Sequence, residues 1–469
     1  MSIIKAINRG LVEKSFSAEE LAKKYINSIK KQNMKINCFV TVTEEIALGR
    51  AKYIDEKTAK EGSLSLLEGV PYSLKDNIST IGTLTTCASK MLESYQPVYN
   101  AYVSSVLENA GGILLGKNNM DEFAMGSASE TSFFGCVKNP LDTACSPGGS
   151  SGGGSAAVCG DMAVFALGSD TGGSVRQPAS YCGLVGLKPT YGAVSRYGLV
   201  AYASSLDQIG VLAKNAEDTA IVFDSISERD LQDSTCRGFF GNTLERLKES
   251  VCGIKIGLYN PSDTEACEAL EKTAKVFESL GCKVEEICLN YMNEVSPAYY
   301  IIACAEAASN LARYDGVRYG YRAEKYNSRN EMICRTRGEG FGEEVKKRIL
   351  FGNYVLSGRD NLYKKANAVR KGITAELESL FEGYDVILMP TTYGTAPLLG
   401  AKASYSSDRF TVPANLAGLP ALSMPCGRNE NGMPFGIQLM GKRFSEGLLL
   451  RLAYKYEKET KEEVSRIEL

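Results

Sequence analysis

The feature of this sequence that most constrains its fold is a repeated order of helix, glycine and strand. The order occurs three times: helical patterns over 100–110, 263–280 and 360–380 end at or near Gly111, Gly281 and Gly383, and strand patterns over 113–115, 282–289 and 386–389 follow. Glycine commonly ends helices, and strands that alternate with helices favour a sheet covered by helices. We therefore predict an α/β fold.

The domain organisation predicted from the sequence is simple. No repeat, low-complexity tract or convincing linker interrupts the 469 residues, of which 44% are apolar. The segment 298–376 is almost wholly helical in pattern and contains many Arg, Lys and Tyr residues. We predict a single domain over 1–469, with a core over about 20–460 and a helical lobe over about 298–376.

Histidine is absent, and this excludes several kinds of active site. Serine or cysteine catalysis with a histidine base, and zinc or haem sites built on histidine, are not possible. The 14 cysteines include no C-x-x-C pair, so we predict no metal site and reduced thiols. The formal net charge of −2 argues against a chain that coats nucleic acid. Without a signal peptide or a long apolar run, we expect the bacterial cytosol.

Glycine and serine are concentrated between residues 148 and 198 in two clusters, GGSSGG at 148–153 and SDTGGS at 169–174. The string that defines a phosphate-binding P-loop does not occur. A weak dinucleotide-binding echo starts at Gly152, but the polar residues before it do not form a strand. A tight structural crossing of glycine-rich backbone remains an alternative to a catalytic site.

The catalytic interpretation needs a base for a serine hydroxyl. A lysine can act as that base when burial lowers its pKa, and Lys75 follows the apolar run VPYSL. The backbone N–H groups of Thr171, Gly172 and Gly173 could hold an oxyanion beside Ser174, which makes Ser174 the candidate nucleophile. Ser150 could carry the proton from Ser174 to Lys75. A lone lysine is more often a solvated surface charge.

These residues resemble the amidase signature family. The resemblance rests on the strings KDN at 75–77, GGSSGG and GSDTGGSVRQPA, and on the separation of 24 positions between Ser150 and Ser174. It implies a large mixed central β-sheet with helices on both faces. It also implies that Lys75 is the base, that Ser150 is a relay serine in a cis peptide bond, and that Ser174 is the nucleophile. The string GGGSAA and Cys159 depart mildly from the family pattern.

Within the family, four longer strings resemble the glutaminase subunits of tRNA-dependent amidotransferases; they lie at 116–130, 191–210, 313–322 and 412–427. The resemblance implies release of ammonia from the side-chain amide of glutamine. A tRNA-binding partner subunit would use ATP and Mg to activate misacylated Glu-tRNA(Gln), and a third, small subunit would complete the assembly. This chain itself would hold no cofactor.

The same resemblance suggests how free glutamine is held. Arg348 would bind the α-carboxylate and Asp408 the α-ammonium group, with help from Tyr299 or Ser127. Arg176 is expected to brace the loop rather than to contact substrate. Two alternatives stay open: a free-standing amidase that acts on a small or hydrophobic amide, and an assembly subunit with a vestigial site.

Overall fold

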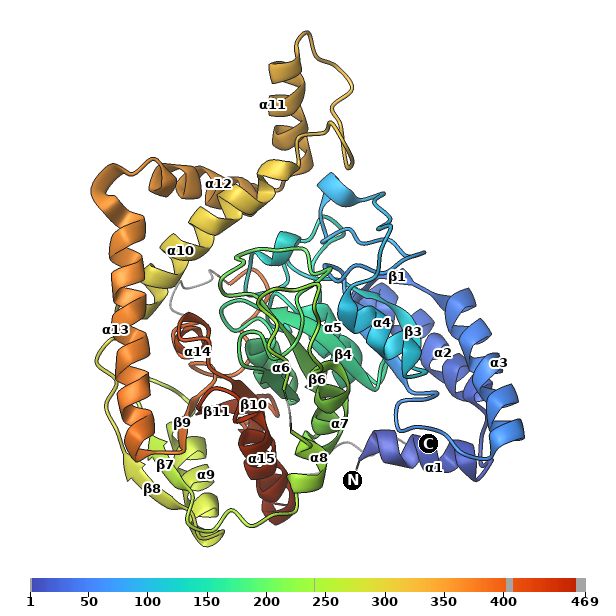
Figure 1. Cartoon of the computed structure of the whole chain (residues 1–469), viewed down its shortest axis with the longest axis vertical. Helices are drawn as coiled ribbons and strands as arrows, with labels where there is room; N and C mark the ends of the chain where they lie inside the picture. Colours follow the sequence, from blue (N-terminus) through green and yellow to red (C-terminus); the bar gives the residue numbers. More distant parts are fainter. Residues whose placement is uncertain (1, 240, 402–407, 461–469) are drawn as a thin grey trace.

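The computed structural model describes residues 2–239, 241–401 and 408–460. In this part of the chain, eleven strands form one mixed sheet in the order β1-β3-β2-β4-β6-β5-β10-β11-β9-β7-β8 (Figure 1). The strands are β1 Phe39–Val42, β2 Pro71–Lys75, β3 Ile113–Asn118, β4 Phe165–Asp170, β5 Val185–Lys188, β6 Gln208–Ala213, β7 Lys255–Leu258, β8 Lys283–Glu286, β9 Val386–Pro390, β10 Ala421–Arg428 and β11 Pro434–Gly441. The α/β prediction is confirmed.

Parallel pairing is confined to two parts of the sheet. Strand β2 lies between β3 and β4 and is parallel to both, and β7 is parallel to β8 and β9. The strands between these two groups, and β1 at one edge, pair in antiparallel fashion. Because β2 and β4 are parallel neighbours, their carboxyl ends meet at the same edge of the sheet.

Fifteen α-helices occur in the described part of the chain. They are α1 Ile3–Val12, α2 Ala18–Ile36, α3 Glu44–Glu61, α4 Tyr102–Asn109, α5 Gly152–Cys159, α6 Arg176–Cys182, α7 Ala216–Ile226, α8 Thr243–Arg246, α9 Cys267–Ser279, α10 Val295–Asn310, α11 Arg329–Gly340, α12 Glu343–Leu356, α13 Leu362–Gly383, α14 Val412–Leu416 and α15 Glu446–Thr460. Ser17 and Glu20 form a capping box at the start of α2. Among helices in the described ranges, none has the length and apolar character needed to cross a membrane.

The sheet has an apolar core on each face. Successive residues of a strand point to opposite faces, and on β9 the side chain of Leu388 joins one core cluster while Ile387 and Met389 join the other. The first cluster includes residues of α1, α2, α7 and α15, and the second includes residues of α10, α12 and α13. Helices therefore cover both faces, as the family resemblance implies.

The helical segment 298–376 is less continuous than the sequence predicts. Helices α10, α11, α12 and α13 are present, but residues 314–328 are not helical. Gly316 and Gly320 adopt positive φ angles there, and the Arg322 guanidinium donates to the carbonyl oxygens of Gly316 and Val317. These local contacts replace helical ones, so the prediction of an almost wholly helical segment is wrong in this stretch. Figure 1 shows α11 projecting away from the sheet.

Candidate active site

Lys75 is the last residue of β2, and its side chain is buried with 1% exposure. Leu74 pairs with Leu167 of β4, and the rings of Tyr72 and Phe165 stack between the same two strands. This pairing brings Lys75 beside Ser169, near the end of β4. Burial lowers the pKa of Lys75 to about 7, although the charges of Asp121, Asp170 and Asp207 oppose the shift. A large fraction of this amine is therefore uncharged near neutral pH.

Three oxygen atoms surround the Lys75 amine. Nζ lies 2.6 Å from Oγ of Ser150, 2.9 Å from Oγ of Ser169 and 3.1 Å from the Ser169 carbonyl oxygen. Asn77 donates to the Ser169 hydroxyl at 3.0 Å and fixes it from the other side. A neutral amine has two N–H groups and one lone pair. Ser169 can accept both N–H groups, which leaves the lone pair for the Ser150 hydroxyl proton.

Sequence reasoning did not find the contributions of Ser169 and Asn77. Asn77 belongs to the KDN string and Ser169 to the SDTGGS string, but neither was given a role. Their common location depends on the parallel pairing of β2 and β4, which the structure shows and no local sequence pattern contains. Two parallel neighbours place the residues at their carboxyl ends together, so a residue near the end of β4 lies beside Lys75.

The two predicted catalytic serines lie on adjacent loops. The peptide bond between Gly149 and Ser150 is cis, as the resemblance implies, and the Ser151 N–H donates to the carbonyl oxygen of Ser174 at 3.1 Å. Among the described residues, the Ser174 hydroxyl makes no hydrogen bond, and it lines a pocket. The structure thus places Lys75 in contact with Ser150 and holds Ser174 beside them, without a hydrogen bond between the two serine hydroxyls.

A buried ion pair shapes the turn before Ser174. The Asp170 carboxylate accepts hydrogen bonds from the N–H groups of Gly173 (2.8 Å) and Val175 (3.1 Å), and from Arg176 Nε (3.0 Å) and Nη2 (2.9 Å). Burial would raise the pKa of Asp170, but the Arg176 guanidinium outweighs it and holds the pKa well below its usual range. Arg176 is fully buried, which confirms that it braces the loop.

The turn supplies unpaired N–H groups close to Ser174. Within the described residues, the backbone N–H groups of Thr171 and Gly172 have no acceptor, and neither does that of Ser174 itself. Gly173 differs from the prediction, because its N–H is already donated to Asp170. The turn therefore offers Thr171 and Gly172 as oxyanion donors, with Ser174 as an addition, while Gly173 shapes the turn.

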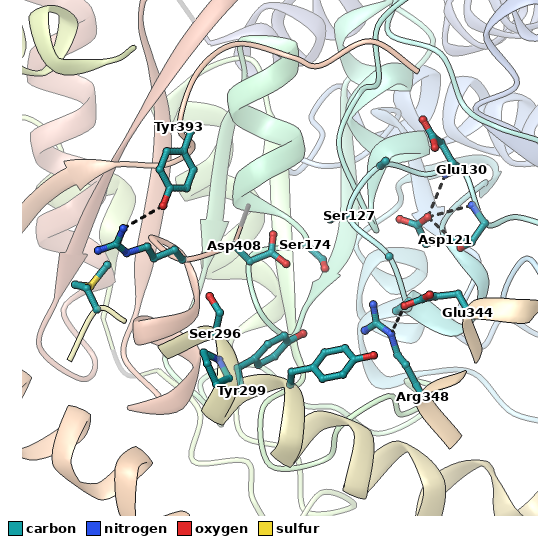
Figure 2. A pocket seen from close by; sticks show the side chains of 18 of the residues that line it. Asp121, Ser127, Glu130, Ser174, Ser296, Tyr299, Glu344, Arg348, Tyr393 and Asp408 are labelled. Atoms are coloured by element: carbon teal, nitrogen blue, oxygen red, sulfur yellow. Dashed lines mark hydrogen bonds and ion pairs between the residues drawn. The ribbon is translucent and has the colours of Figure 1, made fainter. Parts of the chain in front are cut away.

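The four predicted substrate residues lie in one pocket with Ser174. The pocket has a volume of about 730 Å³, and Ser127, Tyr299, Arg348 and Asp408 all line it. In the view of Figure 2, Asp408 and Arg348 lie on either side of Ser174. Arg348 comes from α12 and Tyr299 from α10, whereas Asp408 precedes α14. A cation and an anion thus face the same space as the candidate nucleophile.

Arg348 is held by two residues that sequence reasoning missed. Its Nε donates to Glu344 at 2.9 Å, and its Nη1 donates to the phenol oxygen of Tyr202 at 2.6 Å. Glu344 is one helical turn before Arg348, a spacing that could have predicted the pair. Tyr202 is 146 residues away and had no such signal. Tyr299 packs closely on Gly172, where an added Cβ would lie 2.6 Å from its ring.

The described part of the chain contains no group of three or more His, Cys, Asp or Glu side chains placed to bind a metal ion. The groups around Ser174 are hydroxyl, amine, carboxylate, guanidinium and backbone N–H groups. These are the groups that acyl transfer to a serine requires: a nucleophile, a base and donors for an oxyanion.

Comparison with known proteins points to the same chemistry. The family model described as Amidase matches residues 20–450. The chain is 51% identical to a glutamyl-tRNA(Gln) amidotransferase subunit of Caldanaerobacter subterraneus subsp. tengcongensis, over 96% of this chain and 94% of that protein. It is 47% identical to the subunit of the same name from Synechococcus elongatus, over 98% of each chain.

Solved structures agree with the sequence comparison. The glutamyl-tRNA(Gln) amidotransferase subunit of the same name from Thermotoga maritima has a TM-score of 0.78 and 41% identity, and the match covers 94% of this chain and 91% of that one. The peptide amidase of Stenotrophomonas maltophilia has a TM-score of 0.85 and 27% identity, with 98% and 96% coverage. Through its family match, its curated relatives and its fold, the chain belongs to the amidase family.

Proposed function

We propose that this chain is the glutamine-hydrolysing subunit of a tRNA-dependent amidotransferase that converts Glu-tRNA(Gln) to Gln-tRNA(Gln). The observation that carries the proposal is the pocket in which Arg348 and Asp408 flank Ser174. A free amino acid carries a carboxylate and an ammonium group next to each other, and a guanidinium and a carboxylate are their complements. The names of the relatives, which are about half identical over nearly the whole chain, support the same interpretation.

The reaction follows from the groups around Ser174. Oγ of Ser174 attacks the side-chain amide carbon of glutamine while its proton passes through Ser150 to the neutral amine of Lys75. The backbone N–H groups of Thr171 and Gly172 hold the oxyanion. The C–N bond then breaks, and the Lys75 proton returns through Ser150 to the departing nitrogen, which leaves as ammonia. Water attacks the glutamyl ester by the same route and releases glutamate.

The relay requires one local adjustment. The Lys75–Ser150 hydrogen bond is already formed at 2.6 Å, while the Ser174 hydroxyl is unbonded within the described structure. A hydrogen bond from the Ser174 hydroxyl to Oγ of Ser150 would complete the path. Catalytic hydrogen bonds often tighten only when substrate is bound.

The ammonia must be used elsewhere. The relatives are each named as one subunit of an amidotransferase. We propose a tRNA-binding partner that uses ATP and Mg to activate the misacylated tRNA, together with a small third subunit. The chain itself would hold no cofactor and act in the bacterial cytosol, where translation takes place. We also propose that it folds as a single domain with a helical lobe, because β1 near its start and β11 near its end belong to one sheet.

The decisive experiment is glutamine hydrolysis by the assembled enzyme and by the isolated chain. We expect Ser174→Ala to remove ammonia release from glutamine. Cys159→Ala, a change in the neighbouring helix α5 outside the pocket, should leave the rate near that of the natural chain. An unchanged rate for Ser174→Ala contradicts the nucleophile assignment.

The same assay separates the proposal from its main alternative. A free-standing amidase would hydrolyse amides at full rate without partner subunits, tRNA or ATP, and would favour small or hydrophobic amides over glutamine. A glutaminase subunit should prefer glutamine and work best with its partners and Glu-tRNA present.

A further inference from the structure

The turn at Thr171–Gly173 is held from two sides by residues outside the contacts described so far. On one side, the Thr171 hydroxyl donates to Oδ1 of Asp207 at 2.6 Å. Asp207 is 2% exposed, and it also accepts the backbone N–H groups of Tyr202 at 2.9 Å and Ala203 at 3.0 Å. One buried carboxylate thus joins the turn to the segment that contains Tyr202.

The segment held by Asp207 leads to Arg348, the cation proposed to bind the α-carboxylate of the substrate. The phenol oxygen of Tyr202 accepts a hydrogen bond from Nη1 of Arg348 at 2.6 Å, and the Tyr202 side chain is fully buried. Direct hydrogen bonds and the side chain of Tyr202 therefore form an unbroken route through Arg348, Tyr202, Asp207 and Thr171. Buried groups bonded in this way have little freedom to move independently.

Thr411 joins the other side of the turn to Asp408, the anion proposed to bind the α-ammonium group of the substrate. Its buried hydroxyl donates to the carbonyl oxygen of Gly172 at 2.6 Å, and its backbone N–H donates to the carbonyl oxygen of Asp408 at 3.1 Å. The approach is close, because a Cβ at Gly173 would lie 2.2 Å from Oγ1 of Thr411. With φ at +135°, Gly173 also adopts a conformation that favours glycine.

We propose that Asp207 and Thr411 are positioning residues that couple the grip on the two charged groups of glutamine to the placement of the oxyanion donors Thr171 and Gly172. The inference rests on the proposed glutaminase function and extends it to substrate selection. Arg348 is linked to the turn by hydrogen bonds through Tyr202 and Asp207, and Asp408 is linked to it through Thr411. Binding of the α-carboxylate and the α-ammonium group orders both sides of the turn, so these distant contacts raise kcat as well as affinity.

This coupling predicts how kcat depends on the two charged groups of the substrate. An amide of the same length that lacks one of the two charged groups should be hydrolysed more slowly even at saturation. Two probes remove the groups separately: 4-carbamoylbutanoate lacks the α-ammonium group, and 4-aminobutanamide lacks the α-carboxylate. If the distant contacts served binding alone, kcat would be equal for all three amides and only KM would rise.

The test measures kcat and KM for ammonia release from glutamine and both probes in the assembled enzyme. We expect Thr411→Val and Asp207→Asn each to lower kcat for glutamine by about tenfold to a hundredfold, with KM changed by less than about threefold. Thr411→Val should narrow the kcat ratio between glutamine and 4-carbamoylbutanoate. Asp207→Asn should bring the kcat values for glutamine and 4-aminobutanamide closer together. Thr411→Ser, which keeps the hydroxyl, should restore most of the loss.

Matched control variants exist elsewhere in the chain. Asp218 is a buried carboxylate that also accepts one serine hydroxyl and two neighbouring backbone N–H groups, from Ser2, Ile3 and Ile4. The buried Thr219 hydroxyl donates to the carbonyl oxygen of Asn215 at 2.9 Å. Asp218→Asn and Thr219→Val should therefore remove comparable buried contacts. Neither variant should change the ratio of kcat for glutamine to kcat for either probe.

Several outcomes would overturn the coupling. One is an equal fall in kcat for all three amides in Thr411→Val and Asp207→Asn, and another is a change confined to KM. If these variants do not fold, the natural enzyme still decides, because equal kcat values for glutamine and both probes contradict the inference. Failure of the proposed function looks different: the natural enzyme would release no ammonia from glutamine, and Ser174→Ala would change nothing.

Discussion

Lys75 and Lys188 occupy similar surroundings but differ in what their amines contact. Each is 1% exposed, and burial lowers the pKa of each to about 7. The Lys75 amine faces the hydroxyls of Ser150 and Ser169, whereas the Lys188 amine donates to the carbonyl oxygens of Pro189 at 2.8 Å and Leu419 at 2.5 Å. A carbonyl has no proton to give. Burial therefore makes a lysine a stronger candidate base, but the lysine can accept a proton only from a neighbour such as a hydroxyl.

The largest expected effect is a difference in the rate of glutamine hydrolysis between variants of the two lysines. We expect Lys75→Met to lower the rate of ammonia release from glutamine by at least about a hundredfold, because the general base is lost. Lys188→Met should leave the rate within about threefold of that of the natural chain, since no step of the proposed mechanism uses it. The measurement is kcat/KM for glutamine in the assembled enzyme. Equal losses in both variants would mean that the hydroxyl contacts do not distinguish them.

The next effect is the pH dependence of the rate. Only the neutral form of Lys75 can accept a proton, so kcat/KM should rise with pH and level off above about 7. Below that value it should fall about tenfold per pH unit. Lys188→Met should keep the same inflection. A profile that is flat between about pH 6 and 9 would contradict the assignment of Lys75 as the base.

The smallest effect is one that the two lysines should share. The folded pKa of about 7 lies below the ordinary value of 10.5, so between these values the unfolded chain binds more protons and stability rises with pH. Below about pH 7 the lysine is protonated in both the folded and the unfolded chain, so its unfavourable contribution to the free energy of folding no longer changes with pH. Either lysine-to-methionine variant should reduce the slope by up to about 1.4 kcal/mol per pH unit. Denaturant unfolding between pH 7 and 10 measures it, and an unchanged slope would show that the lysine is charged in the folded state.

Local patterns predicted much of the fold. The helix–glycine–strand order located α4, α9 and α13 and the strands that follow them, because glycine punctuation and apolar periodicity are read within one segment. The prediction failed at 314–328, where Gly316 and Gly320 turn the chain inside an otherwise helical composition. The order of the strands depends on contacts between distant segments, and no local pattern contains it.

The residues of the candidate site also fall into two groups, those that a short string identifies and those that depend on distant contacts. Lys75, Ser150 and Ser174 could be located because each lies in a distinctive short string. Tyr202 and Thr411 could not, since each acts through a residue more than 140 positions away. Gly173 was assigned to the oxyanion donors because it lies in a run of consecutive N–H groups and has no Cβ, and only the structure reveals that its N–H donates to Asp170.

The division of labour along the chain has a practical consequence. The groups proposed to break the amide bond lie between residues 75 and 174, whereas the charged residues that face the substrate come from α12 and the segment before α14. Engineering could therefore exchange the selecting wall while the bond-breaking apparatus stays intact. Such a graft would have to bring its own replacements for Tyr202 and Thr411, or the transplanted wall would recognise a new amide without activating it.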